Sequence, residues 1–207
     1  MTASCTYPLC FHCLQIQGGT ALNTPTSPSG FSLIELITAL TILVIVSSAA
    51  ISAGTQFVQA NRHQTLIAGY FSAFQFARAK AATKRDVVTL CPLDTTNTCH
   101  DDWEKPVAVF PDANKDRQPD NNVVWRELEA PPEAFRVRSR TGGKGYFRFG
   151  MTGMTHGLSG SIVVCPNREK TGLMTYLALN QGGRLRRTLD RNRDDSITLP
   201  WGLKIGC

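Results

Sequence analysis

One long apolar segment constrains the fold of this chain more than any other feature. Residues 31–53 read FSLIELITALTILVIVSSAAISA, which is 23 residues with one charged side chain, Glu35, and without Pro or Gly. A bilayer core of about 30 Å is crossed by roughly 20 apolar residues in a helix. Helices buried in soluble proteins rarely stay apolar for so long without polar relief. The segment therefore predicts a membrane-spanning helix.

The distribution of charge divides the chain at the end of this segment. The 207 residues include 22 Lys and Arg and 16 Asp and Glu, but Glu35 is the only one of these before Arg62. A cleaved secretory signal peptide is not indicated, because residues 1–30 contain no Lys or Arg and the apolar segment is too long. The net charge of +6 is mild, so it permits a polyanionic partner without requiring one.

The apolar pattern continues beyond the predicted span with the period of a helix. Residues 67, 70, 71, 74, 77 and 81 are apolar and share one helical face. Basic residues at 78, 80, 84 and 85 complement the negative end of a helix dipole. We expect one helix from residue 31 to about 83, on the order of 80 Å long. Its membrane half covers residues 31–53, and its amphipathic half covers residues 54–84 and packs on a domain.

The pattern changes to short β-branched runs after the helix, with Gly, Pro, Asn or Asp between them. Residues 85–207 therefore predict an antiparallel β-rich domain, with two sheets packed on the helix, and an α+β fold. The expected strands are 86–91, 107–110, 122–128, 135–138, 145–149, 161–165, 175–179 and 183–186.

The junction before the apolar segment carries a specific motif. Gly30-Phe31-Ser32-Leu33-Ile34-Glu35, followed at once by the long apolar helix, resembles the processing site of type IV prepilins and type II secretion pseudopilins. The resemblance implies that a membrane prepilin peptidase removes the leader, residues 1–30, by cleaving between Gly30 and Phe31. It also implies that Phe31 is N-methylated and that Glu35 neutralises the N-terminal amine of a neighbouring subunit during assembly.

The leader departs from the prepilin pattern. Prepilin leaders are usually short and carry Lys or Arg just before the Gly, whereas this one has 30 residues and ends in Ser29-Gly30. Either translation starts downstream of Met1 or the leader is atypical. Its thiols and histidine are interpreted as reduced groups in a removed peptide rather than as a metal site; they are Cys5, Cys10, His12 and Cys13.

The soluble region is similar to minor subunits of the GspH/FimT type. The similarity rests on Leu90-Cys91-Pro92, Cys99, Trp103, the stretch from Val109 to Asp116, and Gly183-Arg184-Leu185-Arg186. It implies a type IV pilin-like fold, in which a long N-terminal transmembrane and amphipathic helix packs on a C-terminal antiparallel β-sheet domain. It also implies a non-enzymatic minor pilin or pseudopilin, a tip or initiation component without a cofactor, for protein secretion or pilus biogenesis.

The same resemblance implies a location and a set of partners. The protein is expected to be a single-pass inner-membrane protein with a cytoplasmic leader and a periplasmic C-terminal domain. Its expected partners are the prepilin peptidase, the other pilins or pseudopilins of the filament, and the inner membrane. The alternatives of a type II secretion pseudopilus and a type IV pilus stay open from the sequence.

Four cysteines remain after removal of the leader. An even number in an exported domain favours disulfide bonds. Three connectivities are possible, and we expect Cys91 to pair with Cys99 and Cys165 with Cys207. Zinc binding is disfavoured because these four cysteines include no C-x-x-C pair.

Two Asx-rich stretches leave a calcium alternative open. Asp112, Asn114, Asp116 and Asp120 place oxygen atoms at alternating positions, and Asp190, Asn192 and Asp194 repeat the pattern. Both stretches lack the Gly and Glu of an EF-hand loop. Asx turns that bind their own backbone are therefore the simpler interpretation, and no metal site is assigned.

Arginines form two clusters in the soluble region. Residues 136–148 contain Arg136, Arg138, Arg140, Lys144 and Arg148 without an acidic residue, and residues 184–193 contain five further arginines. Such clusters bind phosphate backbones in a salt-dependent manner, or they keep a domain soluble. In relatives of the FimT type, the G-R-x-R arginines are linked to DNA capture. The resemblance therefore names Arg184 and Arg186, with Arg187 beside them, as an alternative DNA-binding site for natural transformation.

Overall fold

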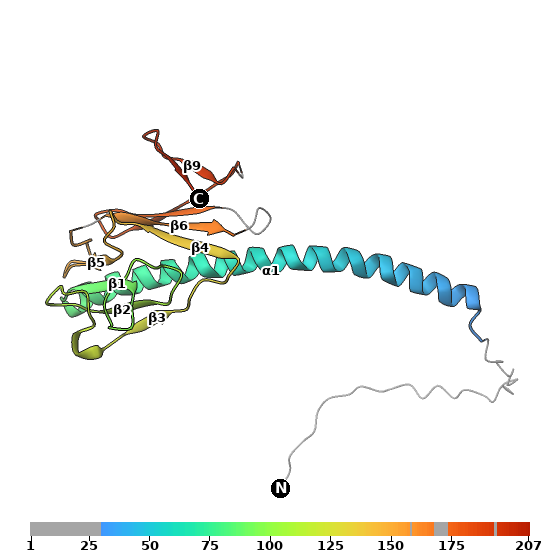
Figure 1. The fold of residues 1–207 in the computed structure, drawn as a ribbon, viewed down its shortest axis with the longest axis horizontal. Coiled ribbons are helices and arrows are strands. Elements are labelled where there is room, and N and C mark those ends of the chain that lie inside the picture. The colour runs from blue at the N-terminus through green and yellow to red at the C-terminus, as the bar shows by residue number, and fades with distance from the viewer. Residues whose placement is uncertain (1–29, 158, 168–173, 193) are drawn as a thin grey trace, which may run out of the picture. The chain divides into compact units, whose positions relative to one another are not determined.

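The computed structural model describes residues 30–157, 159–167, 174–192 and 194–207, with the side chains of residues 49–53, 55 and 56 left aside. The chain divides into two units, of which the first ends at Val44 and the second covers Ile45–Cys207. One helix, α1, covers Leu33–Lys84. It is followed by β1 (Val88–Pro92), β2 (Val107–Pro111), the short 3₁₀ helix η1 (Asp120–Asn122), β3 (Arg126–Leu128), β4 (Phe135–Arg140), β5 (Phe147–Phe149), β6 (Gly160–Pro166), β7 (Thr175–Leu179), β8 (Leu185–Leu189), β9 (Ser196–Thr198) and β10 (Lys204–Gly206). The expected α+β fold is confirmed (Figure 1).

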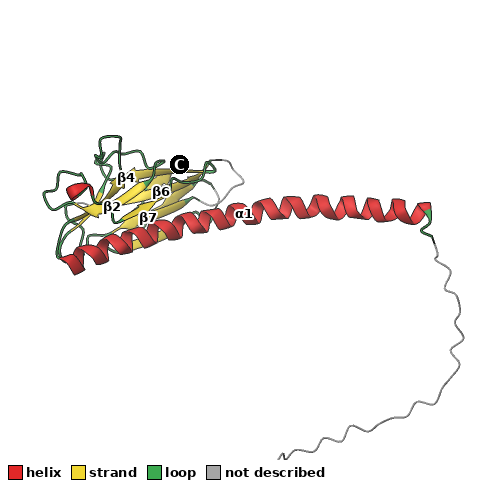
Figure 2. Ribbon diagram, turned by 90° about the horizontal axis from the view of Figure 1, so that it is seen from below, coloured by secondary structure: helices red, strands yellow, loops and turns green. Residues whose placement is uncertain are grey.

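The strands of the second unit form two four-stranded antiparallel sheets and one hairpin. The strand order is β3-β2-β1-β5 in the first sheet and β4-β6-β7-β8 in the second, and β9 pairs with β10. In Figure 2 the strands lie along one side of the later part of α1. The two-sheet expectation is confirmed, and β9 and β10 are strands that the sequence analysis did not predict.

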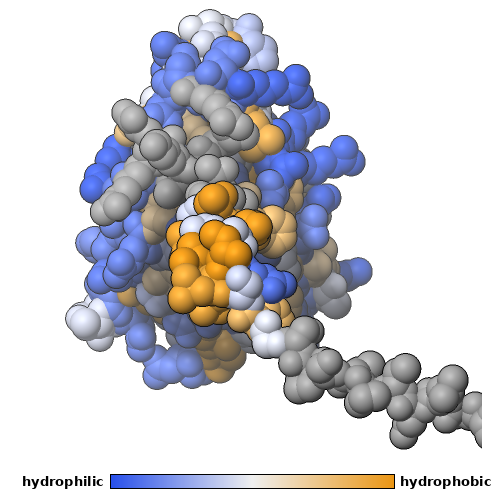
Figure 3. All heavy atoms as spheres, turned by 90° about the vertical axis from the view of Figure 1, so that its right-hand side faces the viewer, coloured by the Kyte–Doolittle hydropathy of each residue, from blue (hydrophilic) through white to orange (hydrophobic). Residues whose placement is uncertain are grey.

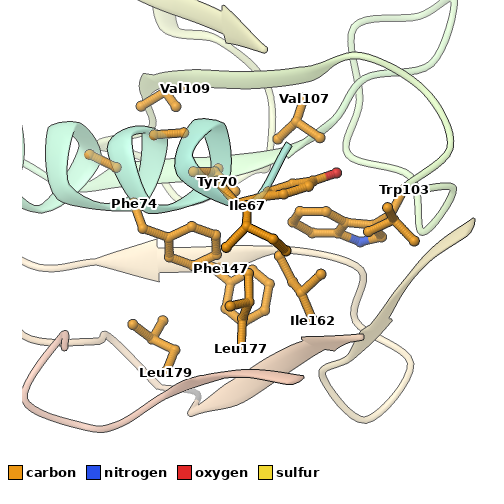
Figure 4. Packing of buried hydrophobic residues seen from close by; sticks show 14 of the residues in the cluster. Ile67, Tyr70, Phe74, Trp103, Val107, Val109, Phe147, Ile162, Leu177 and Leu179 are labelled. Atoms are coloured by element: carbon orange, nitrogen blue, oxygen red, sulfur yellow. The ribbon is translucent and has the colours of Figure 1, made fainter. Parts of the chain in front are cut away.

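The second half of α1 forms the core together with both sheets. Its apolar face, with Ile67, Tyr70 and Phe74 fully buried, packs against Val107 and Val109 of the first sheet and against residues of the second, such as Leu177. Figure 4 shows these side chains interleaved with Trp103 and Phe147. The helical spacing read from the sequence therefore marks the face that joins the two sheets.

Aromatic contacts and one close approach make this packing specific. Phe74 meets Phe147 edge-to-face with ring centroids 4.9 Å apart, and Trp103 meets Phe147 at 5.4 Å. Such pairs add about 0.5–1.5 kcal/mol to the burial of their surface. A Cβ at Gly69 would lie 2.9 Å from Leu128 Cδ1, so the glycine allows α1 to approach the end of β3 closely.

The β9–β10 hairpin covers the second sheet on the face that does not contact α1. Successive side chains of β6 and β7 point to opposite faces of the sheet. Ile162 and Leu177 therefore belong to the core formed with α1, while Val163 and Tyr176 belong to a second apolar cluster. The hairpin packs onto this second cluster through three buried residues, Ile197, Leu199 and Ile205. An isolated hairpin is marginally stable, so its position depends on this apolar contact and on the covalent bridge described below.

The start of α1 belongs to the first unit and is exposed along its described length. Every residue from Gly30 to Ser48 is exposed. Of the residues that the structure describes, no helix is long and apolar enough to cross a membrane. The side chains of residues 49–53, which complete the span expected over residues 31–53, lie outside the described residues, so that span stays a prediction.

One buried histidine couples α1 to the second sheet. His63 is 5% exposed, its Nε2 lies 3.1 Å from Thr175 Oγ1 on β7, and its ring packs on Phe135 of β4. Burial, with the nearby Arg187 guanidinium as a second cause, lowers the pKa of His63 from its ordinary value of 6.5. Folding therefore favours the neutral form of this imidazole.

This coupling predicts a pH dependence of stability. As the pH falls through 6.5, the unfolded chain binds a proton on His63 more readily than the folded chain does, so the free energy of unfolding falls with the pH. Between pH 7.5 and pH 5, we expect the titration of His63 to lower the free energy of unfolding by an amount on the order of 1 kcal/mol. Urea unfolding of the wild-type protein and of His63→Gln, at both pH values, measures the difference. Equal pH slopes for the two proteins would contradict the assignment.

Candidate functional site

The segment expected to be processed lies directly before α1. Gly30, Phe31 and Ser32 are exposed and outside the helix, and Phe31 exposes 84% of its surface. The first helical hydrogen bond joins the Leu36 amide to the Ser32 carbonyl at 3.1 Å. The peptide bond between Gly30 and Phe31 therefore lies outside the helical hydrogen bonds. The leader up to Ser29 lies outside the described residues, including its cysteines and histidine.

Glu35 occupies the first turn of α1. It is exposed among exposed Leu33, Ile34 and Leu36, and Figure 3 shows the apolar side chains gathered at this end of the helix. The positive end of the helix dipole favours a carboxylate in this turn. An apolar surrounding strengthens any ion pair that the carboxylate forms. The geometry suits binding of a cationic amine by Glu35.

The hydroxyl groups near Glu35 are satisfied within the helix. Thr38 Oγ1 donates to the Glu35 carbonyl at 2.9 Å, and Thr41 Oγ1 donates to the Thr38 carbonyl at 2.8 Å. Ser48 Oγ makes the same bond to the Ile45 carbonyl at 2.8 Å. In an apolar environment these hydroxyls would therefore not carry the cost of an unsatisfied donor. Glu35 remains the charged group of this surface.

Two disulfide bonds have the pairing expected from the sequence. Cys91 on β1 is bonded to Cys99, and Cys165 on β6 is bonded to Cys207. The first closes the loop after β1, where Leu93 also bridges to Cys99. The second ties the end of the β9–β10 hairpin to the second sheet, and Arg138 Nη1 donates to the Cys207 carbonyl at 3.2 Å. A disulfide across 42 residues restricts the unfolded chain, which in the chain-entropy model is worth about 4 kcal/mol.

Members of both arginine clusters lie on the two edge strands of the second sheet as the structure describes it: Arg136, Arg138 and Arg140 on β4, and Arg186 and Arg187 on β8. Arg140 on β4 and Arg186 on β8 stand in one row, with Ser161 and Ala178 between them. Four strands at about 4.8 Å spacing place their backbones about 14 Å apart on one face. Charged side chains on edge strands also oppose pairing with another sheet.

The candidate DNA-binding arginines do not all face the same way. Arg184 and Arg186 are exposed and two residues apart, so they lie on one side of the chain. Arg187 lies on the other side of β8, where its Nη1 donates to Gln64 Oε1 of α1 at 3.3 Å. The structure thus separates Arg187 from the pair, and DNA binding stays a prediction.

Arg148 is not part of a surface cluster, which corrects the sequence analysis. Its side chain is 8% exposed and its Nη2 lies 2.7 Å from Oδ2 of the fully buried Asp112. Its Nε donates to Thr89 Oγ1 at 3.1 Å, and its guanidinium lies 4.8 Å from the centre of the Tyr146 ring. A count of charges along the sequence could not distinguish this buried arginine from its exposed neighbours.

The carboxylates of the calcium alternative already have protein partners. Asp112 pairs with Arg148 and also accepts from the Arg117 amide, and Asp120 Oδ2 accepts from the Ala113 amide at 2.8 Å. Asn114 and Asp116 bond to each other. In the second stretch, Asp190 accepts from the Asn192 amide and Asp194 from the Ser196 amide. In the described part of the chain, no three His, Cys, Asp or Glu residues are grouped to hold a metal.

Comparison with protein families decides the assignment. The family model described as type II transport protein GspH matches residues 69–183, which is more than half of the chain. The chain belongs to the GspH family. A second model, the prokaryotic N-terminal methylation motif, matches residues 27–51. This GspH-family chain is therefore a structural, non-enzymatic minor pseudopilin of type II secretion, processed through its methylation motif.

The methylation motif and the family also give the coarse location and partners. The motif implies a prepilin that is anchored in the inner membrane and assembled into a pseudopilus. The family implies processing by prepilin peptidase and assembly with other pseudopilins.

Solved structures of two minor subunits are similar to the GspH-family chain. The type IV minor pilin FimU of Pseudomonas aeruginosa is 15% identical with a TM-score of 0.49, covering 63% of this chain and 94% of that one. The minor pseudopilin EpsH from the type 2 secretion system of Vibrio cholerae is 10% identical with a TM-score of 0.42, covering 59% and 94%. No curated protein sequence matches the chain. The family assignment rests on the two family models.

Sequence reasoning missed two features of the second unit. One is the buried Thr89–Asp112–Arg148 group, whose members are far apart in sequence. The other is the tip of the β9–β10 hairpin, where Trp201 is 70% exposed. A hairpin signature in the sequence could have identified the second feature. Polar and apolar residues alternate in Ser196-Ile197-Thr198 and in Lys204-Ile205-Gly206, and Pro200-Trp201-Gly202 lies between them.

Proposed function

We propose that this chain is cleaved between Gly30 and Phe31, is N-methylated on Phe31, and enters a type II secretion pseudopilus at its tip. Residues 31–53 cross the inner membrane before assembly and enter the filament core afterwards. The β-rich unit then lies in the periplasm. The observation that carries this proposal is the exposed carboxylate in the first turn of an exposed apolar helix.

Glu35 is the residue that holds the assembling subunit in register. The N-terminal amine created by cleavage carries a positive charge, and a neighbour's carboxylate within an apolar bundle is a favourable partner for it. An unpaired carboxylate costs about 2.5–3.5 kcal/mol at the centre of a bilayer and less near its edge. Pairing relieves this cost and thereby favours incorporation of the subunit over its return to the membrane.

Replacing Glu35 should separate processing from assembly. Glu35→Ala and Glu35→Gln should be cleaved normally, because the cleaved bond lies before the helix. Incorporation into filaments should fall by about ten- to 100-fold, as expected for the loss of a charge-assisted hydrogen bond of about 1.5–3 kcal/mol. Immunoblots of the membrane and sheared-filament fractions measure both quantities.

Thr38→Ala is the matched control, because its hydroxyl binds only its own helix backbone among the bonds described here. It should assemble like the wild-type protein. Normal incorporation of both Glu35 variants would contradict the proposed role.

DNA capture is a second candidate function, which is favoured by the exposed pair Arg184 and Arg186. Arg184→Gln/Arg186→Gln should weaken binding of a DNA duplex by the full-length protein at low salt, and wild-type binding should collapse as salt is raised. Arg187→Gln is the control, because Arg187 faces α1. Fluorescence anisotropy with a labelled duplex measures the affinities. Equal binding by the double variant and the wild type would exclude this function.

A further inference from the structure

A groove lies between residues 57–66 of α1 and residues 127–132, which end β3 and begin the connection to β4. It measures about 460 Å³. In Figure 1 the chain between β3 and β4 runs beside α1 toward the earlier part of the helix. Both walls are largely apolar, and the charged residues among those that line them are Arg62, Glu127 and Glu129. The groove therefore combines an apolar surface with one cation and two carboxylates.

Contacts outside the groove hold its two walls in place. Arg126 on β3 donates to Ser72 Oγ of α1 at 2.9 Å, so the strand is fixed against the helix beside the groove. Beyond β3, Pro131 and Pro132 restrict the backbone, and the Phe135 amide donates to the Pro132 carbonyl at 2.8 Å. The groove is thus a preformed hollow, which lowers the entropic cost of binding a ligand.

The charged groups of the groove are accessible to a ligand. Arg62, Glu127 and Glu129 are exposed, and none of them belongs to either ion pair found among the described residues. A ligand with charge of one sign meets repulsion from one of the walls, since the cation lies on α1 and the carboxylates lie on the opposite wall. A ligand that carries both signs on neighbouring groups is attracted by both walls.

The groove begins just beyond the predicted membrane span. Phe57 and Val58 line it and are 72% and 46% exposed. They follow residue 53 by four and five positions, which is about 6–8 Å along a helix. The headgroup layer on each side of a bilayer core is about 5–8 Å thick. Arg62 lies about 14 Å beyond residue 53, and its side chain extends back toward the span because helical side chains tilt toward the N-terminus.

We propose that this groove holds one phospholipid of the ethanolamine type while the unassembled subunit resides in the inner membrane. The inference rests on the proposed span over residues 31–53 and names a specific lipid contact beside it. One acyl chain covers the apolar walls. The phosphate pairs with Arg62, and the ammonium group donates hydrogen bonds to Glu127 and Glu129.

The headgroup chemistry distinguishes this lipid from the alternatives. Phosphatidylglycerol carries a negative charge and no ammonium group, so the two carboxylates oppose it. Phosphatidylcholine carries a quaternary ammonium without an N–H, so it cannot donate hydrogen bonds to the carboxylates. An apolar helix of another subunit covers the apolar walls without using any of the three charges.

Native mass spectrometry of the full-length protein tests the lipid contact. The protein is released from detergent micelles that contain equal amounts of phosphatidylethanolamine, phosphatidylglycerol and phosphatidylcholine. We expect a single phosphatidylethanolamine to be retained. Glu127→Gln/Glu129→Gln and Arg62→Gln should each lower the retained fraction by about tenfold or more, as for the loss of a charge-assisted hydrogen bond.

Glu133→Gln and Arg136→Gln are the matched controls, because both residues are exposed and neither lines the groove. Both should retain the lipid like the wild-type protein. Equal retention of the three lipids by the wild type, or unchanged retention by the groove variants, would overturn the proposal.

Photolabelling locates the lipid independently. Phosphatidylethanolamine with a diazirine near the start of one acyl chain is mixed into phosphatidylglycerol vesicles that contain the full-length protein, and the labelled peptides are identified after irradiation. Labels should fall on residues 57–66 and 127–132. Labels on residues 31–53 alone would mean that lipid only surrounds the span, which contradicts the proposal. Competition by soluble phosphoethanolamine would also contradict it, because the acyl chain supplies the apolar part of the binding.

Alkaline carbonate extraction of the same vesicles separates this inference from the proposed function. A chain that stays in the membrane without retaining phosphatidylethanolamine has the span but not the lipid site, so the inference alone fails. A chain that carbonate removes lacks the span, and the proposed function fails with it. If the groove crosslinks in cells to another pseudopilin and the isolated subunit retains no lipid, a protein covers the groove and the lipid proposal is wrong.

Discussion

The structure depends on one apolar face of α1, from Leu66 to Ala81, that is shared by two sheets. Val107 and Val109 reach it from the first sheet, and Ile162 and Leu177 reach it from the second. Because both sheets bury their inner faces on the same helix, neither has a complete core without it. The part of α1 before Ser48 has the opposite character, since its described apolar side chains are exposed. One helix therefore stabilises the β-rich unit with one part and exposes apolar side chains with the other.

A buried polar group and a disulfide bond position segments that apolar packing alone does not hold in place. The Asp112–Arg148 pair with Thr89 joins β1, β5 and the loop after β2 inside the first sheet. Removing one partner of a buried ion pair leaves an uncompensated charge and costs about 3–5 kcal/mol. On the second sheet, the Cys165–Cys207 bridge holds a hairpin that, among the described residues, has no strand pairing with that sheet. These two interactions hold the loop after β2 on the first sheet and the hairpin on the second.

The sequence predicted the elements whose signal is local and periodic. Apolar spacing predicted α1 to within one residue of its end at Lys84, and the eight expected runs each contain or overlap a strand. Gly30 to Glu35 indicated the prepilin class because a short motif coincided with a long apolar helix. The sequence could not show that Arg148 is buried while Arg140 is exposed, since both lie in one basic run and the pairings of β1 with β5 and with β2 together bring Arg148 to Asp112. It also could not show that Arg140 and Arg186 share a row, because three strand pairings set that register.

The central claim is that the mature subunit begins at Phe31 with a modified amine that Glu35 of a neighbour can bind. Mass spectrometry of the N-terminal peptide, from protein purified out of membranes that contain prepilin peptidase, tests this most directly. The account predicts a peptide that starts at Phe31 and carries one methyl group on its α-amine, and a full-length precursor when the peptidase is absent. A mature chain that retains Gly30, or that starts behind the apolar segment, would contradict it.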